Sequence, residues 1–483
     1  MSDSPTIAPA DAAGILAAIR SGALTAEKAV ADALDKAKSL TSLNAIIYLD
    51  REGALAAARH IDDARASGAQ LGPLAGLPIV VKDNINTAAM PTSGGTPALR
   101  NVRPTSNAPS LQKLLDAGAI VIGKANMHEL AFGITSTNLS PFAGVVHNPY
   151  DTTRIPGGSS GGTAAAVAAG IVTCGLGTDT GGSTRVPAAL TGIVGLRPSV
   201  GNGGAERRYH NDGAVVPISR TRDTVGPMGR SVADVALLDS VIAGTPVPTP
   251  AKLAGLRLAV PPSLWDGLED TLRPVVREAR AKLAAAGVEF VEAEIEGLFD
   301  LNNKISFVVA LHEPAEDIPA YLAATGVSGI TIADVAAGVA SPDVRGAFEA
   351  ILADAFKDAY PEAMTVHRPA LQKLYADYFA AARVDAILFP TTIAPAPVID
   401  RAAGSAQMSV NGGPPADTFA TMIRNTDPAS NAGLPGLSLY AGMTGQGLPV
   451  GLEIDGPVGS DSKLLSIGLA IEQVLGLAPA PKL

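Results

Sequence analysis

Apolar and polar residues recur with helix and strand periods along the first part of the chain. Residues 10–40 carry apolar positions at helical spacing and predict two alanine-rich amphipathic helices. The apolar stretch 44–49 predicts a strand, and another helix is predicted through about Ala66. A β-branched run then ends at Lys82 and predicts a second strand.

The alternation of helix and strand continues further along. A helix that stops at a glycine is predicted at 108–118, before an apolar strand at 119–123. Similar helix–strand pairs are predicted at 275–291 and 371–389. Repeated pairs of this kind are typical of an α/β fold with a largely buried mixed sheet.

The region 300–380 differs from the rest because its pattern is helical and alanine-rich, without strand signals. We expect it to form a helical cover on one side of the sheet. The Gly/Pro-rich stretches at 245–252 and 402–416 are short and flanked by ordered patterns, which does not fit flexible linkers. The sequence therefore predicts one domain over residues 1–483.

Charge and composition exclude several classes of function. The net charge is −10, and binding nucleic acid needs clustered Lys and Arg, so we expect no nucleic-acid partner. The densest basic stretch, Arg207 and Arg208 followed by Arg220 and Arg222, is interleaved with acids and is interpreted as loop surface. One cysteine, Cys174, excludes an internal disulfide framework and a multi-cysteine metal site.

Targeting signals are not evident in the sequence. The first 14 residues have neither a basic nor an apolar region of the kind that begins a secretory signal. The longest apolar runs are interrupted before the ~20 residues that a membrane span needs. We expect a cytoplasmic protein that does not associate with membranes, as a monomer or a homodimer.

The most unusual segment is the glycine- and serine-rich region 156–197, which allows several interpretations. A flexible linker is disfavoured because periodic apolar sequence follows directly. The Gly-Gly-Ser-Ser-Gly-Gly loop lacks the Gly-Lys-Ser/Thr of a phosphate loop and the preceding strand of a dinucleotide site. A nucleophile elbow would need a strand before the serine and a late histidine outside helical pattern. A lactamase-like pair, Ser110 and Lys113, lacks the downstream Lys-Thr-Gly, and Ser110 fits a helix start better.

The remaining interpretation of the region 156–197 is a serine hydrolase that uses no histidine as its base. Serine needs a base to take its proton, and none of the six histidines lies beside a serine–glycine loop. A lysine can serve as that base when burial lowers its pKa. Lys82 suits this role because it ends a β-branched strand, so its side chain starts inside the sheet layer.

Lys82, the run Gly-Gly-Ser159-Ser-Gly-Gly and the run Gly-Thr-Asp-Thr-Gly-Gly-Ser183-Thr-Arg together resemble the amidase signature family. The stretches 425–438 and 447–457 resemble the C-terminal strands of that family. The resemblance implies an α/β fold with a central mixed β-sheet covered by helices on both faces. It also implies an amidase with a Ser-cisSer-Lys triad.

The resemblance implies a role for each residue of the set. Ser183 would attack the amide carbon, Ser159, preceded by a cis peptide bond, would relay its proton, and Lys82 would be the base. The backbone N–H groups of Thr180, Gly181 and Gly182 would form the oxyanion hole. No cofactor and no metal are implied. Next to the nucleophile, Asp179 and Arg185 are expected to pair and hold its turn, and Ser160 is expected to bond the loop backbone or the Lys82 amine.

The substrate is less defined by the sequence. Residues 124–138 and 217–228 resemble the branch of indoleacetamide and mandelamide hydrolases, which implies a small aromatic or hydrophobic carboxamide. Anilides, carbamates, esters and oligoamides stay open, as does an A subunit of a glutamyl-tRNA amidotransferase working with partner subunits. Against that last alternative, the acidic residue which such a subunit carries is not matched by Ile423, Arg424 or Asn425, although Asp427 stands nearby, next to Pro428. Met127 is expected at the substrate pocket, and Phe307 and His312 are further candidates.

Overall fold

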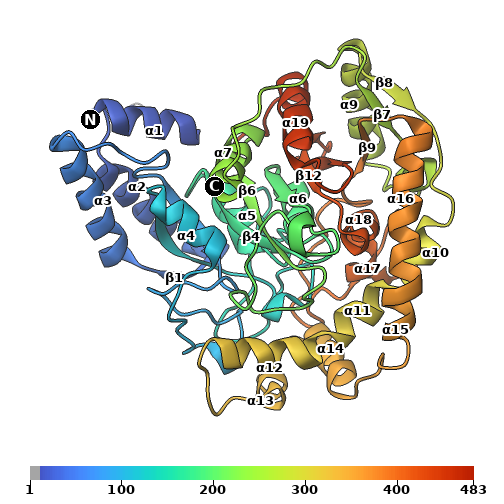
Figure 1. Ribbon diagram of the computed structural model, residues 1–483, viewed down its shortest axis with the longest axis horizontal. Helices are drawn as coiled ribbons and strands as arrows, with labels where there is room; N and C mark the ends of the chain where they lie inside the picture. Colours follow the sequence, from blue (N-terminus) through green and yellow to red (C-terminus); the bar gives the residue numbers. More distant parts are fainter. Residues whose placement is uncertain (1–10) are drawn as a thin grey trace.

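A computed structural model describes residues 11–483 of the chain (Figure 1). Residues 1–10, which include most of the segment on which the expected lack of a secretory signal rests, lie outside the described residues. The strands are β1 Ile46–Leu49, β2 Pro78–Lys82, β3 Ile120–Ala125, β4 Cys174–Asp179, β5 Val194–Arg197, β6 Thr224–Gly229, β7 Arg257–Ala259, β8 Glu289–Val291, β9 Ala386–Pro390, β10 Gln407–Met408, β11 Ala416–Asp417, β12 Gly436–Met443 and β13 Pro449–Asp455.

The described chain also contains nineteen α-helices. The α-helices are α1 Ala12–Ser21, α2 Ala26–Ser39, α3 Arg51–Ala66, α4 Pro109–Asp116, α5 Gly161–Ala168, α6 Arg185–Thr191, α7 Val232–Ala243, α8 Pro262–Trp265, α9 Arg273–Ala285, α10 Leu298–Asn303, α11 Ser306–His312, α12 Pro314–Ala324, α13 Ile332–Ala337, α14 Pro342–Leu352, α15 Tyr360–Glu362, α16 Arg368–Ala382, α17 Thr418–Ile423, α18 Asp427–Ala432 and α19 Asp461–Leu475. Short 3-10 turns are η1 Thr41–Leu43, η2 Pro97–Leu99, η3 Glu129–Ala131 and η4 Gly204–Glu206, and η5 Ala363–His367 is a π-helical turn.

Eleven strands of the described chain form one mixed sheet in the order β1-β3-β2-β4-β6-β5-β12-β13-β9-β7-β8. Strand β2 runs parallel to both β3 and β4, and β7 runs parallel to β8 and β9, whereas the other neighbours are antiparallel. Strands β10 and β11 pair separately as a small antiparallel hairpin between residues 407 and 417. The sequence pattern did not predict this hairpin. The predicted α/β fold with a central mixed sheet is confirmed.

Strand β2 shows how the sheet separates two apolar layers. Ile79 and Val81 pack into one cluster, with helices α1, α4 and α7. Val80 packs into the cluster on the other face, with α2, α3 and α5. Successive side chains of a strand point to opposite faces, so Lys82 shares the face of Val80 and lies on the α5 side.

The glycine-rich strand β4 escaped the pattern analysis because its sequence, Cys-Gly-Leu-Gly-Thr-Asp, carries little alternation in side-chain size. Its glycines have a packing function. A Cβ on Gly177 would lie 2.7 Å from Ser160 Oγ, so only glycine lets the loop before α5 approach the strand this closely.

Residues 298–382 form helices α10–α16, and no strand occurs within this range. Helices α10, α11 and α16 pack against β7 and β9 through a cluster that contains Ala259, Ile387 and Phe389. Helices α12–α14 lie along the lower edge of the molecule in Figure 1 and pack on η2 and η3 rather than on the sheet. Only part of this region therefore covers the sheet, while the rest covers loops.

Among residues 11–483, no helix has the length and apolar character needed to cross a membrane.

Candidate active site

The side chain of Lys82 is completely buried at the carboxyl end of β2. Its Nζ donates to the hydroxyl oxygen of Ser159 at 2.6 Å and to that of Thr178 at 2.7 Å. Burial lowers the pKa of Lys82 to about 7, although the carboxylates of Asp179 and Asp223 act in the opposite direction. A lysine with this pKa carries a substantial neutral fraction near pH 7 and can accept a proton.

The loop before α5 brings Ser159 to Lys82. The Gly158–Ser159 peptide bond is cis, in agreement with the family resemblance. The backbone carbonyl of Ser159 accepts the N–H of His128 at 3.1 Å. Because Ser159 is fully buried and bonded on both its backbone and its side chain, its hydroxyl is held in one place beside the amine.

Ser160 has a different environment from its neighbour. Its hydroxyl donates to the carbonyl of Thr178 at 3.1 Å and accepts the N–H of the same residue at 3.2 Å. Of the two roles expected for Ser160, the structure supports bonding of the backbone rather than of the Lys82 amine. The N–H of Ser160 donates to the carbonyl of Ser183 at 3.2 Å, which places the two serine loops in contact.

Ser183 lies in the turn 180–183 between β4 and α6, 7% exposed. Within residues 11–483 its hydroxyl has no hydrogen-bond partner, and it lines a cavity. The structure therefore brings together Lys82 and Ser159 by a direct hydrogen bond, and Ser183 by contact of its loop with the loop of Ser159 and Ser160.

A buried ionic network holds the Ser183 turn. The carboxylate of Asp179 accepts the N–H groups of Gly182 at 3.0 Å and Thr184 at 3.1 Å, and it pairs with Arg185 at 3.0 Å and Arg197 at 3.1 Å. Burial alone would raise the pKa of Asp179, but the two guanidinium groups hold it well below its usual range. The expected pairing of Asp179 with Arg185 is confirmed, and the anion stays charged at every ordinary pH.

The three N–H groups predicted for the oxyanion hole are not equivalent. In the part of the chain that the structure describes, the N–H groups of Thr180, Gly181 and Ser183 bond to no protein acceptor. The N–H of Gly182 instead donates a hydrogen bond to the carboxylate of Asp179. The free donors next to Ser183 are therefore those of Thr180 and Gly181, with that of Ser183 itself.

Ser183, Thr180 and Gly181 open into a cavity of about 490 Å³. Most of its wall is apolar, and the larger apolar side chains come from four separate segments of the chain. The larger apolar side chains are Phe132, Ile134, Ile218, Phe307, Leu311, Phe419 and Ile423. The rings of Phe307 and Phe419 are tilted by 44° to each other, with centroids 5.9 Å apart. A wall of this composition fits an apolar group attached to the reacting carbonyl.

Met127 does not line the cavity. It is fully buried one layer behind the wall, where it packs against Ala131 and Ile218. Of the other residues named from the sequence, Phe307 lines the cavity, whereas His312 lies outside it and binds Asp354 at 2.8 Å. The sequence placed Met127 at the pocket because an apolar residue beside a functional loop looks the same whether it lines a cavity or packs in the core.

Helix α14 reaches the cavity through Asp343, whose Oδ2 lies 3.0 Å from Nε2 of His128. Nδ1 of His128 accepts the N–H of Ser136 at 3.1 Å, so its proton is carried on Nε2, toward the carboxylate. The same residue donates its backbone N–H to Ser159. His128 and Asp343 were not predicted as a pair, because more than 200 residues separate them in the sequence.

Arg222 corrects the interpretation of the basic stretch as loop surface. It is 3% exposed, lines the cavity and pairs with Asp427 at 2.6 Å. Arg208 is also bound, to Asp239 at 2.6 Å. Asp427 thus places a carboxylate in the cavity wall two residues after Asn425, but Arg222 neutralises it.

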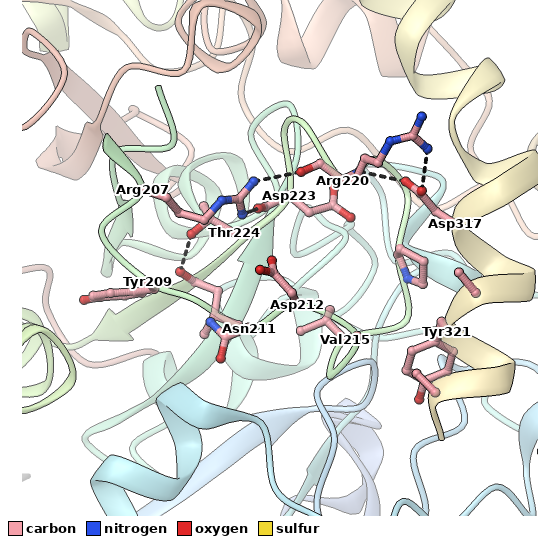
Figure 2. A pocket seen from close by; sticks show the side chains of 15 residues that line it. Arg207, Tyr209, Asn211, Asp212, Val215, Arg220, Asp223, Thr224, Asp317 and Tyr321 are labelled. Atoms are coloured by element: carbon pink, nitrogen blue, oxygen red, sulfur yellow. Dashed lines mark hydrogen bonds and ion pairs between the residues drawn. The ribbon is translucent and has the colours of Figure 1, made fainter. Parts of the chain in front are cut away.

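A second cavity, of about 340 Å³, lies beside the loop 217–223 that contains Arg222 (Figure 2). The loop contributes Ile218 and Arg222 to the first cavity and Arg220 and Asp223 to the second. Figure 2 shows Arg220 directed at Asp317, with which it pairs at 2.7 Å. None of the three residues predicted to react lines this cavity, so we place the candidate active site in the first.

Residues 28–465 match the Amidase family. The chain is 41% identical to mandelamide hydrolase of Pseudomonas putida, over 96% of this chain and 91% of that protein. It is 43% identical to indoleacetamide hydrolase of Rhizobium radiobacter, over 91% of this chain and 92% of that protein. A crystal structure of an amidase superposes with a TM-score of 0.84 at 34% identity, covering 97% of this chain and all of the other. The chain belongs to the amidase signature family and is an amide hydrolase.

Proposed function

We propose that this amidase cleaves a small aromatic or hydrophobic carboxamide through an acyl-enzyme on Ser183. Ser159 relays the proton of Ser183, and Lys82 is the base that receives it. The observation that carries this proposal is the buried contact between Lys82 Nζ and Ser159 Oγ at 2.6 Å, in the loop that touches Ser183. Serine needs such a base to become a nucleophile at neutral pH.

The proposed first half-reaction ends in an ester. Ser183 Oγ attacks the amide carbon while its proton passes to Ser159, and the proton of Ser159 passes to neutral Lys82. The N–H groups of Thr180 and Gly181 stabilise the oxyanion of the tetrahedral intermediate. Gly182, predicted for the same role, contributes by fixing the turn through Asp179. The proton then returns through Ser159 to the leaving nitrogen, the C–N bond breaks and the amine departs.

The second half-reaction uses the same relay for water. Water gives a proton toward Ser159 and Lys82 as its oxygen attacks the ester carbon. The second tetrahedral intermediate collapses, Ser183 takes back a proton and the carboxylic acid is released. Each half-reaction leaves Lys82 neutral again, so its pKa of about 7 suits both directions of transfer.

The wall of the cavity supports an aromatic or hydrophobic acyl group. Phe307, Phe419 and Ile134 offer apolar surface close to the oxyanion donors. The sizes of the two relatives' named substrates, mandelamide and indoleacetamide, are compatible with a cavity of about 490 Å³. The leaving group stays open to ammonia, an aniline or a carbamate nitrogen, and ester cleavage is a variant of the same chemistry.

An amidotransferase A subunit is the second candidate function. Asp427 lines the cavity and supplies a carboxylate that could hold the amino group of glutamine. Its ion pair with Arg222 opposes this role, because the carboxylate is already neutralised. We therefore favour the free-standing hydrolase.

A release assay on a substrate panel tests the proposal. The panel contains phenylacetamide, indoleacetamide, an anilide, a carbamate, an ester and glutamine, each with wild type and Ser183→Ala. We expect the arylacetamides to be the best amides and Ser183→Ala to be inactive on all of them. Glutamine as the only good substrate would support the amidotransferase, and turnover by Ser183→Ala would contradict the mechanism.

A further inference from the structure

Arg222 makes contacts that connect the cavity to the backbone beside Ser183. Its Nη2 donates to the carbonyl of Thr180 at 3.2 Å and to Asp427 Oδ1 at 2.6 Å, and its Nη1 donates to the carbonyl of Ser306 at 2.9 Å. The guanidinium is therefore fixed by three groups from three different segments. Fixed guanidinium groups orient what they bind, because their donors form a rigid planar fork.

The bond to Thr180 determines the direction of a neighbouring N–H. The carbonyl of Thr180 and the N–H of Gly181 belong to one planar trans peptide, in which they point in opposite directions. When Arg222 holds the carbonyl, the N–H of Gly181 must point away from the guanidinium. That N–H is one of the unpaired donors beside Ser183 among residues 11–483.

The adjoining peptide is held in the same way. Thr426 Oγ1 donates to the carbonyl of Gly181 at 2.6 Å, and the N–H of Gly182 in that peptide donates to Asp179 at 3.0 Å. The hydroxyl of Thr180 donates to Asp223 at 2.6 Å. These bonds fix the surroundings, but among them only the bond from Arg222 acts on the carbonyl of the Thr180–Gly181 peptide.

Asp427 holds the guanidinium itself. Its Oδ2 accepts Nδ2 of Asn302 and Nδ2 of Asn431, both at 3.0 Å, while Oδ1 binds Arg222. A Cβ on Gly181 would lie 2.9 Å from Asp427 Oδ1 and 3.3 Å from Nη2 of Arg222. The pair therefore packs against the peptide and is not a free cation that waits for an anionic substrate.

We propose that Arg222, held by Asp427, is a positioning residue that orients the Gly181 N–H toward the substrate oxyanion. This inference rests on the proposed function, because it requires a tetrahedral intermediate at Ser183. Arg222 contributes little to the binding of the neutral amide and much to the stability of the intermediate. Replacing Arg222 is consequently expected to lower kcat and to leave KM nearly unchanged.

The test compares Arg222→Met with Arg220→Met on the same loop. Arg220 pairs with Asp317 beside the second cavity (Figure 2), whereas the carbonyl of Thr180 accepts its hydrogen bond from Arg222. Four quantities are measured: kcat and KM for phenylacetamide, the inhibition constant of benzylboronic acid, and the dissociation constant of phenylacetate. The boronic acid forms a tetrahedral adduct with a reactive serine, whereas phenylacetate reports only binding in the cavity.

For Arg222→Met we expect kcat to fall roughly 10- to 100-fold, below the ~10²–10³ known for complete loss of an oxyanion donor. The affinity for benzylboronic acid falls by a similar factor, while KM and phenylacetate binding change less than about threefold. Arg220→Met behaves as wild type. A wild-type kcat in Arg222→Met, or a raised KM with unchanged kcat, would overturn the inference.

Removing Arg222 alone leaves Asp427 buried and unpaired, which destabilises a fold. Arg222→Met/Asp427→Leu removes both charges and serves as the second variant, with its thermal midpoint measured beside that of wild type. It must lose kcat and boronate affinity as Arg222→Met does; if it folds and retains both, the inference is wrong. Turnover in Ser183→Ala would instead show that the proposed function has failed, whichever result the Arg222 variants give.

Discussion

Lys82 Nζ lies 2.6 Å from Ser159 Oγ, and both side chains are fully buried. Among residues 11–483 no carboxylate bonds to the amine, and its hydrogen-bond partners there are the hydroxyls of Ser159 and Thr178. A buried lysine without a directly bonded anion loses the stabilisation of its charged form, and its pKa falls. The position that makes Lys82 costly to protonate therefore suits the role of base that we propose for it.

The pH dependence of turnover follows from this pKa. An ordinary lysine titrates near 10.5, whereas burial lowers the pKa of Lys82 to about 7. The proposed mechanism needs the neutral amine, so kcat/KM should be low at acidic pH and rise through about pH 7 to a plateau. A profile from pH 5 to 9 measures this. A flat profile across that range would contradict the assignment of Lys82 as base.

Replacing Thr178 with valine should shift the acidic limb of the pH profile, the range in which kcat/KM rises with pH. The hydroxyl of Thr178 accepts a hydrogen bond from Lys82 at 2.7 Å, and an acceptor stabilises the ammonium more than the amine. Its loss should lower the pKa of Lys82, so the limb shifts to lower pH. Thr163→Val is the matched control, because Thr163 is buried and bonds the carbonyl of Leu176 instead. An unchanged limb in Thr178→Val would show that this contact does not influence the base.

The two adjacent serines should respond differently to alanine. Ser159→Ala interrupts the proton relay, and we expect kcat to fall about 10²–10⁴-fold, the range of general acid–base contributions. Ser160→Ala removes two buried bonds to Thr178 and should lower the free energy of unfolding by about 1–3 kcal/mol, with a much smaller change in kcat. Steady-state kinetics and urea unfolding of both variants check this. Equal kinetic losses would refute the distinction between them.

The aromatic wall should determine preference for the acyl group. Phe419 lines the cavity and its ring lies 5.9 Å from that of Phe307. Phe419→Ala should reduce kcat/KM for phenylacetamide about 5- to 30-fold, equivalent to about 1–2 kcal/mol of lost apolar burial, and should affect acetamide much less. Phe142→Ala, on an exposed ring outside the cavity, is the control. Equal losses for both amides in Phe419→Ala would contradict an acyl-binding role.

The sequence predicted the elements whose signal is local. The strand that ends at Lys82 and the helix–strand pairs near 108–123 and 371–389 follow from periodicity, and they are present. Strand β4 was not predicted, because glycines replace the side chains that would have shown its period. The hairpin β10–β11 was also missed, because two-residue strands leave no periodic trace.

The residues that surround Lys82, Ser159 and Ser183 were harder to predict from the sequence. Lys82 could be named because it ends a β-branched strand, and Ser159 and Ser183 because their glycine-rich runs resemble those of the amidase signature family. Arg222 looked like surface because its neighbours are polar, and its partner Asp427 is 205 residues away. Partners of this kind are set by the topology of the sheet and the packing of loops, which no local pattern encodes.

Trapping the acyl-enzyme tests the central claim most directly. Wild type is mixed with a phenylacetyl ester, quenched in acid and digested, and the acylated peptide is identified by mass spectrometry. The mechanism predicts a phenylacetyl group on the peptide that contains Ser183, slower acylation in Ser159→Ala and none in Ser183→Ala. Acylation of another residue on the turnover timescale, or continued turnover by Ser183→Ala, would contradict it.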